Sequence, residues 1–141
     1  MARYDCDVVI VEDDPQVADG IRDGVRVAGY TVAGVAADGD TAVDLVRQRR
    51  PRLAIIDVDL GSAESGIAVA RRLLEVGSLG IVYVTGYPDQ VARADVGHAW
   101  MPKPYRLLDL INALQVVDAL SQRRPITAPI PAELRLIVPA S

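Results

Sequence analysis

Acidic side chains follow two short apolar runs of the sequence. Glu12 and Asp13 come directly after one run, and Asp57 and Asp59 stand at the end of another. Carboxylates that converge on one point repel one another, so they are stable together only if a hard cation shares them or if some stay protonated. Mg²⁺ prefers oxygen ligands of this kind, and these acids therefore predict a magnesium site.

A hydroxyl and an ammonium group occupy the corresponding places after two later apolar runs. Thr85 directly follows one of these runs, and Lys103 comes shortly after the other. An aspartate can act as a nucleophile toward phosphorus, and the outer phosphoryl oxygens then need donors such as these two groups. The pattern predicts phosphoryl transfer onto Asp57. Lys103 is the one lysine beside 14 arginines, which indicates that a compact point charge is needed there.

The same residues also have purely structural interpretations. Asp14 precedes a proline and predicts a helix N-cap without a metal role. Glu12 or Asp13 alone would be a solvated loop acid, and Asp57 or Thr85 alone would satisfy a turn. Because these residues recur together at the ends of apolar runs, the functional interpretation is favoured.

Short apolar runs alternate with helical patterns along the whole chain, which is typical of a parallel sheet with helices on both faces. The predicted strands are Val8 to Val11, Thr31 to Ala36, Leu53 to Ile56, Ile81 to Val84 and Ala99 to Met101. The predicted helices are Pro15 to Ala28, Thr41 to Arg49, Ile67 to Val76, a small and mobile one from Pro88 to Asp95, and Leu107 to Leu120.

The order of the strands follows from where the chemistry lies. Active sites of open parallel sheets lie just beyond the carboxyl ends of the strands. The second strand ends in Ala36 and Ala37, which offer no reactive group. A doubly wound α/β sheet of five parallel strands in the order 2-1-3-4-5 explains this, because the second strand is then at an edge and the first in the middle.

Composition limits the function further. The chain has 141 residues, 50% of them hydrophobic, and a formal net charge of -4. One core is expected, and the acidic balance argues against direct binding to nucleic acid or to an anionic membrane. With no apolar run as long as a membrane span or a signal core, a cytoplasmic protein is expected. The lone Cys6 and His98 exclude a metal site built from several such ligands, and His98 is expected in a partly exposed loop.

The end of the chain differs from the rest. We expect a domain over residues 1–121 and a Pro-rich apolar tail over residues 122–141, with no room for an effector domain. Four of the nine prolines fall in this tail, where helix and strand periods both fail. Its aliphatic residues are too numerous for a solvated linker, so the tail either packs on the domain or meets a partner, and packing is favoured.

Four motifs carry a family resemblance. In chain order they read VVIVEDDP, LAIIDVDLG, IVYVTGYPD and WMPKPY. Together they resemble the CheY-like receiver domain of response regulators, and the resemblance runs from about Asp7 to Leu120. It implies a flavodoxin-like fold, Mg²⁺ as the cofactor and a role in a phosphorelay.

The resemblance assigns roles to the acids. It implies that Asp57 is the phosphoacceptor, supplied by a partner histidine kinase or histidine phosphotransferase. It implies that Asp13 binds Mg²⁺ directly, beside Asp57 and the backbone carbonyl of Asp59. Glu12 would act on the ion through a water molecule.

The resemblance also assigns the residues around the phosphoryl group. Thr85 and Lys103 match the switch hydroxyl and the phosphate-binding lysine, and Trp100 matches the switch aromatic position. The Lys103–Pro104 bond is often cis in this family, and cis is accessible at X-Pro.

Two features distinguish this chain within the family. The YVTGY run is similar to receivers of the Phe-Ala-Thr-Gly-Tyr type, which often occur as single-domain regulators. No proline follows Asp57 shortly, unlike in many receivers. Asp59 and Tyr87 flank the expected path of the hydrolytic water, so both are candidates for setting the lifetime of the phosphoryl group.

These features predict a switch rather than an enzyme, with at most self-phosphorylation and self-dephosphorylation. Its output would be binding to a downstream protein target, and a homodimer is left open. An alternative is a haloacid-dehalogenase-like phosphatase, in which Asp57 is the nucleophile and Asp59 the acid/base. Against it, that family places its metal acids after the nucleophile, whereas Glu12 and Asp13 precede it. A degenerate receiver that only binds proteins is disfavoured because all the expected site residues are present. A flavin-binding module is disfavoured because the acidic first loop would repel its phosphate.

Overall fold

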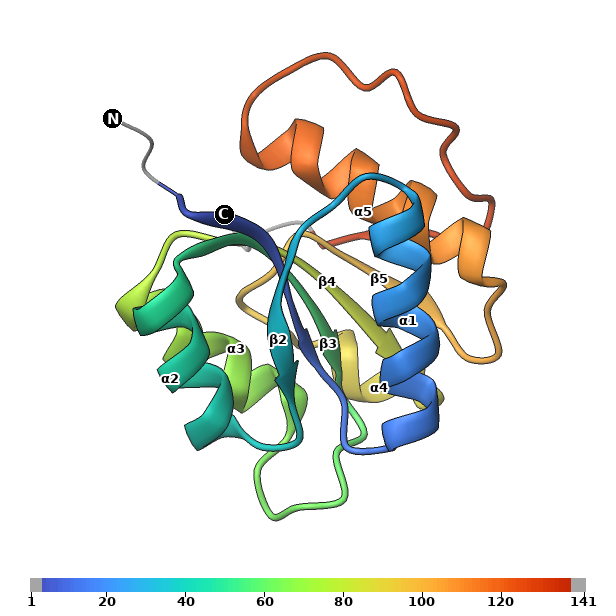
Figure 1. Cartoon of the computed structure of the whole chain (residues 1–141). Coiled ribbons are helices and arrows are strands. Elements are labelled where there is room, and N and C mark those ends of the chain that lie inside the picture. The colour runs from blue at the N-terminus through green and yellow to red at the C-terminus, as the bar shows by residue number, and fades with distance from the viewer. Residues whose placement is uncertain (1–3, 138–141) are drawn as a thin grey trace.

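A six-stranded sheet forms the centre of the molecule (Figure 1). The computed structural model describes residues 4–137. The strands are β1 (Cys6–Val11), β2 (Val32–Ala36), β3 (Pro51–Asp57), β4 (Gly80–Thr85), β5 (Ala99–Pro102) and β6 (Arg135–Leu136). The helices are α1 (Pro15–Val27), α2 (Gly39–Arg49), α3 (Gly66–Val76), α4 (Pro88–Val91) and α5 (Leu107–Ser121).

Neighbouring strands follow the order β2-β1-β3-β4-β5-β6. All pairs among the first five strands are parallel. The predicted order of these five strands is therefore present, with β2 at an edge. The prediction of a sheet with five strands is wrong, because β6 adds a sixth strand antiparallel to β5.

The sixth strand comes from the tail. Arg135 and Leu136 pair with β5, and the N–H of Ile137 donates to the carbonyl of His98 at 2.9 Å. Leu134 is buried beside them, so the tail packs on the domain, as favoured from its composition. A strand of two residues has too few positions for an alternating pattern, and the sequence therefore could not indicate it.

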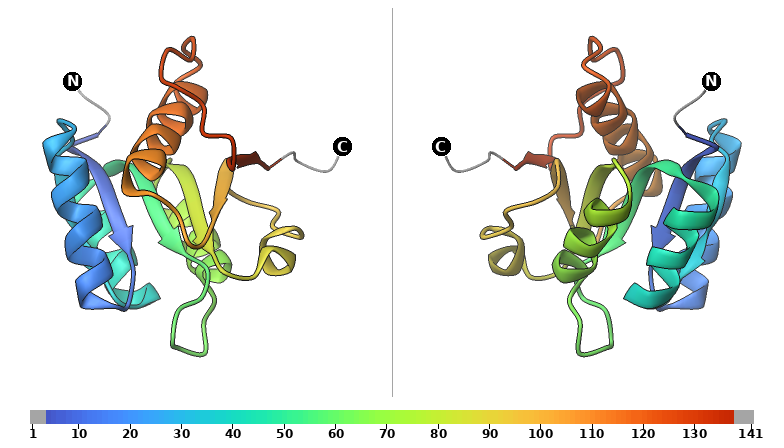
Figure 2. Two further views of the ribbon diagram at one scale, coloured as in Figure 1. Left: turned by 90° about the vertical axis from the view of Figure 1, so that its right-hand side faces the viewer. Right: turned by 90° about the vertical axis from the view of Figure 1, so that its left-hand side faces the viewer.

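Helices cover both faces of the sheet (Figure 2). α2, α3 and α4 pack on one face, and α1 and α5 pack on the other. Successive strand residues point to opposite faces, so Val9 and Val11 contact the first layer while Val8 and Ile10 contact the second. This burial on both sides explains why the strands read as almost continuous apolar runs.

The ends of two helices show which features local sequence patterns can predict. The Asp14 carboxylate accepts hydrogen bonds from the N–H groups of Gln16 and Val17 at the start of α1, which confirms the predicted N-cap. α4 has only 4 residues, Pro88–Val91, and does not extend to Asp95 as predicted. Val91 is the one buried residue of this helix, so packing does little to lengthen it.

A partly buried arginine ties three elements together at the amino-terminal ends of the strands. Arg52 of β3 donates to Asp7 of β1 at 3.0 Å and to Asp118 of α5. Its guanidinium lies 5.8 Å from the centre of the Tyr30 ring. Buried charges are tolerated when they are paired in this way. The network fixes the end of the sheet opposite the acidic loops.

The packed tail leads to a first prediction. A variant that ends at Arg124 loses β6 and the buried Leu134 side chain, whose burial contributes roughly 2 kcal/mol. We expect a lower thermal midpoint by calorimetry, and a smaller loss of the same sign for Leu134→Ala. Leu136→Ser is the control, because Leu136 is 55% exposed and should change the midpoint little. An unchanged midpoint after truncation would instead favour a tail that binds a partner.

The histidine next to β6 leads to a second prediction. The N–H of Ile81 donates to His98 Nδ1 at 3.1 Å, and burial lowers the pKa of His98. The unfolded chain therefore binds the proton more readily, and stability is lost as the pH falls below about 6.5. We expect the midpoint of His98→Asn, which keeps an acceptor without titrating near this pH, to fall less than that of the wild type between pH 7.5 and 5.5. Equal losses would contradict the assignment.

Candidate functional site

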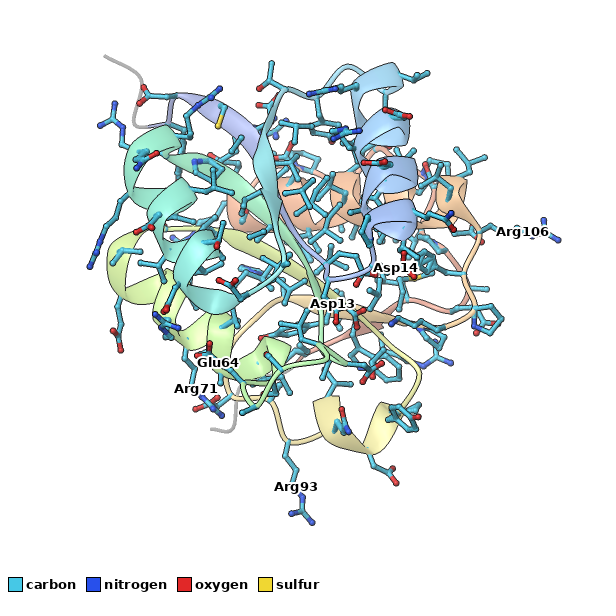
Figure 3. All side chains as sticks on the ribbon, turned by 60° about the horizontal axis from the view of Figure 1, so that its bottom comes forward. Asp13, Asp14, Glu64, Arg71, Arg93 and Arg106 are labelled. Atoms are coloured by element: carbon cyan, nitrogen blue, oxygen red, sulfur yellow. The ribbon has the colours of Figure 1, made fainter. Side chains whose placement is uncertain are left out.

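The predicted site residues meet at the carboxyl ends of the strands. Glu12 and Asp13 follow β1, Asp57 ends β3, and Thr85 ends β4. Lys103 follows β5. Figure 3 shows Asp13 and Asp14 at this edge, whereas Arg93 and Arg106 point outward from it. β2 contributes nothing, since it lies at the edge of the sheet beyond β1.

Three carboxylates form one group at this edge. Single oxygens of Glu12, Asp13 and Asp57 all lie within 4.8 Å of one another. Glu12 and Asp57 are only 4% and 3% exposed, while Asp13 is exposed. Two buried acids beside an exposed one fit a hard cation that enters from solvent, so the donor set agrees with Mg²⁺.

Burial and the repulsion within this group raise the pKa of Glu12. Burial, a hydrogen bond with Asp57 and the charge of Asp57 raise the pKa of Glu12 to about 8. Its Oε2 accepts the N–H of Asp13 at 2.9 Å, which holds the side chain at the base of the loop. A bound cation would favour the ionised form of this carboxyl and remove the repulsion.

Asp57 is held from two sides. Its Oδ2 accepts from Lys103 Nζ at 2.8 Å, and its Oδ1 accepts from the N–H of Asp59 at 2.8 Å. Burial alone would lower the pKa of Lys103, but the hydrogen bond and charge of Asp57, together with the charges of Asp59 and Glu12, outweigh it and the pKa is raised. The ammonium is therefore charged at neutral pH and oriented toward the acceptor oxygen.

Asp59 lies between Asp57 and Thr85. Its carboxylate accepts from the hydroxyl of Thr85 at 3.0 Å and from the N–H of Gly86 at 2.8 Å. Lys103 Nζ lies 3.6 Å from the same carboxylate. The Thr85 hydroxyl in turn accepts the N–H of Tyr87 at 3.0 Å. Asp59 therefore contacts the residues expected to bind the phosphoryl group.

Two expected features lie on β5 and beyond it. Trp100 is half-buried opposite Tyr83 in the register of β4 and β5, and it packs in the same apolar cluster as Ile137 of the tail. It lies along the strand rather than among the site carboxylates. The Lys103–Pro104 peptide bond is cis, as expected.

Sequence reasoning missed two glycines that shape the site. The N–H of Gly61 donates to Asp13 Oδ2 at 2.7 Å, and the N–H of Gly66 donates to the carbonyl of Val58 at 3.1 Å. A Cβ at Gly66 would lie 2.2 Å from the carbonyl oxygen of Asp57. Glycines in the loop after Asp57 were the available signal, because only glycine allows such close backbone approach.

Comparison with known proteins agrees with this geometry. The family model described as "Response regulator receiver domain" matches residues 8–115. The chain therefore belongs to the response regulator receiver domain family. Membership in this family implies a role in two-component phosphorelay signalling.

Relatives with curated descriptions are response regulators. The chain is 35% identical over 125 residues to the transcriptional regulatory protein PdtaR of Mycobacterium tuberculosis, covering 86% of this chain and 60% of that protein. It is 30% identical over 128 residues to the regulatory protein TorR of the torCAD operon of Escherichia coli, covering 85% and 55%. The chain thus spans about 60% or less of the length of these two relatives.

A solved structure of similar fold is the signal receiver domain of a modulated diguanylate cyclase from Desulfovibrio desulfuricans. It has a TM-score of 0.72 and 27% identity, covering 84% of this chain and 97% of that one. Within residues 4–137, no helix is both long and apolar enough to cross a membrane.

The close approach at Gly66 generates a third prediction. In Gly66→Ala, the new Cβ meets backbone atoms of Asp57 and Val58, which cannot move without shifting the Asp57 side chain. We expect a loss of about 1–3 kcal/mol in the free energy of unfolding, measured by urea titration. Gly20→Ala is the matched control, because nothing lies within 4 Å of its new Cβ and alanine favours a helix. Equal stability of the two variants would contradict the packing.

Proposed function

We propose that this chain is a phosphoacceptor switch in which Asp57 receives a phosphoryl group from a histidine kinase or a histidine phosphotransferase. The observation that carries the proposal is the environment of Asp57. This buried carboxylate lies between the Lys103 ammonium and two further acids, Glu12 and Asp13. Asp13 is the exposed member of this group, so the site is open to solvent on that side. A nucleophile, a phosphate-binding cation and a metal donor set are thereby adjacent.

In this reaction the phosphoryl group would pass from a donor histidine to the carboxylate of Asp57. One carboxylate oxygen forms the new bond to phosphorus, and the bond from phosphorus to the donor nitrogen breaks with its electron pair on the leaving histidine. Lys103 Nζ, now 2.8 Å from Asp57 Oδ2, would turn to a phosphoryl oxygen. The N–H of Asp59 keeps Asp57 Oδ1 oriented through its 2.8 Å hydrogen bond.

The proposed donor set for Mg²⁺ comes from the carboxyl ends of two strands, β1 and β3. Asp13 and Asp57 would bind the ion through their carboxylates, Asp59 through its backbone carbonyl, and Glu12 through a water molecule. The ion supplies positive charge that offsets the carboxylates and the phosphoryl oxygens. Asp13 is already oriented by Gly61, whose N–H donates to it at 2.7 Å.

The output would pass along β4 and β5 to a protein partner. The N–H of Lys103 donates to the carbonyl of Thr85 at 2.8 Å, so both phosphate-binding residues share one ladder. Movement of Thr85 on phosphorylation would reach Trp100 along the same pair of strands. We place this switch in the cytoplasm, assign the receiver to residues 1–121 and treat residues 122–141 as an appended tail.

We propose no catalytic turnover beyond self-phosphorylation and self-dephosphorylation. The lifetime of the phosphoryl group would depend on Asp59 and on Tyr87, whose side chain is exposed beside Thr85. The family match gives no support to a haloacid-dehalogenase-like phosphatase.

The fourth prediction tests this function directly. After incubation with acetyl phosphate and Mg²⁺, we expect intact-mass spectrometry to show one phosphoryl adduct on the wild type. We expect no adduct on Asp57→Ala or after chelation of the metal. Asp44→Ala removes an exposed acid from α2 and should leave the adduct unchanged.

Free phosphate is followed in the same samples. Slow release that tracks decay of the adduct agrees with a switch. Catalytic release without an adduct would contradict it and favour a phosphatase. An adduct that persists in Asp57→Ala would show that another residue is the acceptor.

A further inference from the structure

The Asp59 carboxylate takes up hydrogen-bond donors of the kind that a phosphoryl group needs. It accepts a hydroxyl hydrogen from Thr85 at 3.0 Å and a backbone hydrogen from Gly86 at 2.8 Å. The Lys103 ammonium lies 3.6 Å away. Hydroxyl, amide and ammonium donors are what bind phosphate oxygens in proteins. An anionic side chain of this protein therefore already occupies them.

The position of Asp59 explains how it reaches these donors. Its N–H is fixed to Asp57 at 2.8 Å, which places its side chain directly beside the acceptor. The side chain is only 16% exposed, so its hydrogen bonds are partly shielded from water. Hydrogen bonds to a charged group in such a place are worth more than those on an open surface.

We infer that Asp59 is a built-in competitor for the phosphoryl group and must leave Thr85, Gly86 and Lys103 before they can bind it. This inference rests on the proposed function. A dianionic phosphoryl group on Asp57 would repel the adjacent Asp59 carboxylate and need the same donors. Acceptance of phosphate and release of Asp59 are therefore one coupled event, and Asp59 sets how readily the receiver accepts phosphate.

The structure provides space for the displaced side chain. A cavity of about 520 Å³ lies between the loop after β3 and α4, and Asp59 forms part of its wall. Ser62, Ser65 and Gln90 also line it and offer polar groups, with Tyr87 at its side. Asp59 would exchange its present donors for these groups and water.

A purely structural role for Asp59 makes the opposite prediction. If the carboxylate only tied the loop after β3 to β4, its removal would loosen the phosphate site and weaken binding of a phosphoryl analogue. If it competes, its removal frees three donors and strengthens binding. The direction of the change in affinity therefore separates the two roles, whatever happens to stability.

The fifth prediction uses fluoroberyllate, a non-covalent analogue of the phosphoryl group, titrated calorimetrically with Mg²⁺ present. We expect Asp59→Ala to bind it about tenfold more tightly than the wild type, which corresponds to about 1.4 kcal/mol. Asp59→Asn keeps the size of the side chain and should shift binding in the same direction by less. Both variants keep the backbone carbonyl that is proposed for the metal.

Asp89→Ala is the matched control. It removes one negative charge from α4 at the same edge of the sheet, whereas the Thr85 hydroxyl is hydrogen-bonded to Asp59 and Tyr87. We expect its affinity to stay within twofold of the wild type, which would show that the effect of Asp59 is not one of net charge. Thermal midpoints of all variants are measured alongside, and Asp59→Asn serves if Asp59→Ala does not fold.

The outcomes separate this inference from the proposed function. Equal or weaker binding by both Asp59 variants, with normal binding by the wild type, would overturn the inference and leave the switch intact. Wild type that neither binds fluoroberyllate nor gains an adduct would overturn both. Binding that survives in Asp57→Ala would also overturn both, because the analogue would then lie elsewhere.

Discussion

Repulsion among buried carboxylates is the constraint on which the rest of this site depends. Asp57 and Glu12 are almost fully buried. An unpaired charge is costly in a buried place. The chain meets this cost in three ways. Lys103 pairs with Asp57, the raised pKa of Glu12 allows that carboxyl to hold a proton, and backbone N–H groups point at the carboxylate oxygens. These N–H groups are available only while the loops keep their conformation. The conformation of the loops and the stability of the charged carboxylates therefore depend on each other.

β5 connects this edge to the far side of the sheet. Lys103 follows it directly, its residues pair with β4, and the tail strand runs along its outer side. The same four residues therefore adjoin Lys103 and Thr85, the two residues proposed to bind phosphate, and the tail. If Thr85 moves as proposed, the pairing of β4 with β5 and of β5 with β6 would give that movement a short route to the surface that β6 covers.

Much of this architecture could be predicted from the sequence. The strand order and the convergence of Glu12, Asp13 and Asp57 follow from apolar runs and from what stands at their ends. The length of α4 and the presence of β6 could not be predicted, because each depends on tertiary contacts rather than on a local period. The orientation of the Asp59 side chain toward Thr85 could not be predicted from the sequence either. Sequence places a residue after a strand, but neighbouring loops decide where its side chain turns.

The tail strand also affects how readily copies of this protein could aggregate through their sheet edges. An open sheet edge is a template on which strands of other chains can add, and proteins protect such edges. Here β6 covers β5 and leaves an outer strand of only two residues. At the opposite edge, the register between β1 and β2 shifts near Gly34, whose φ is 156°. One edge is short and the other irregular, so the sheet is poorly suited to continuous growth by strand addition.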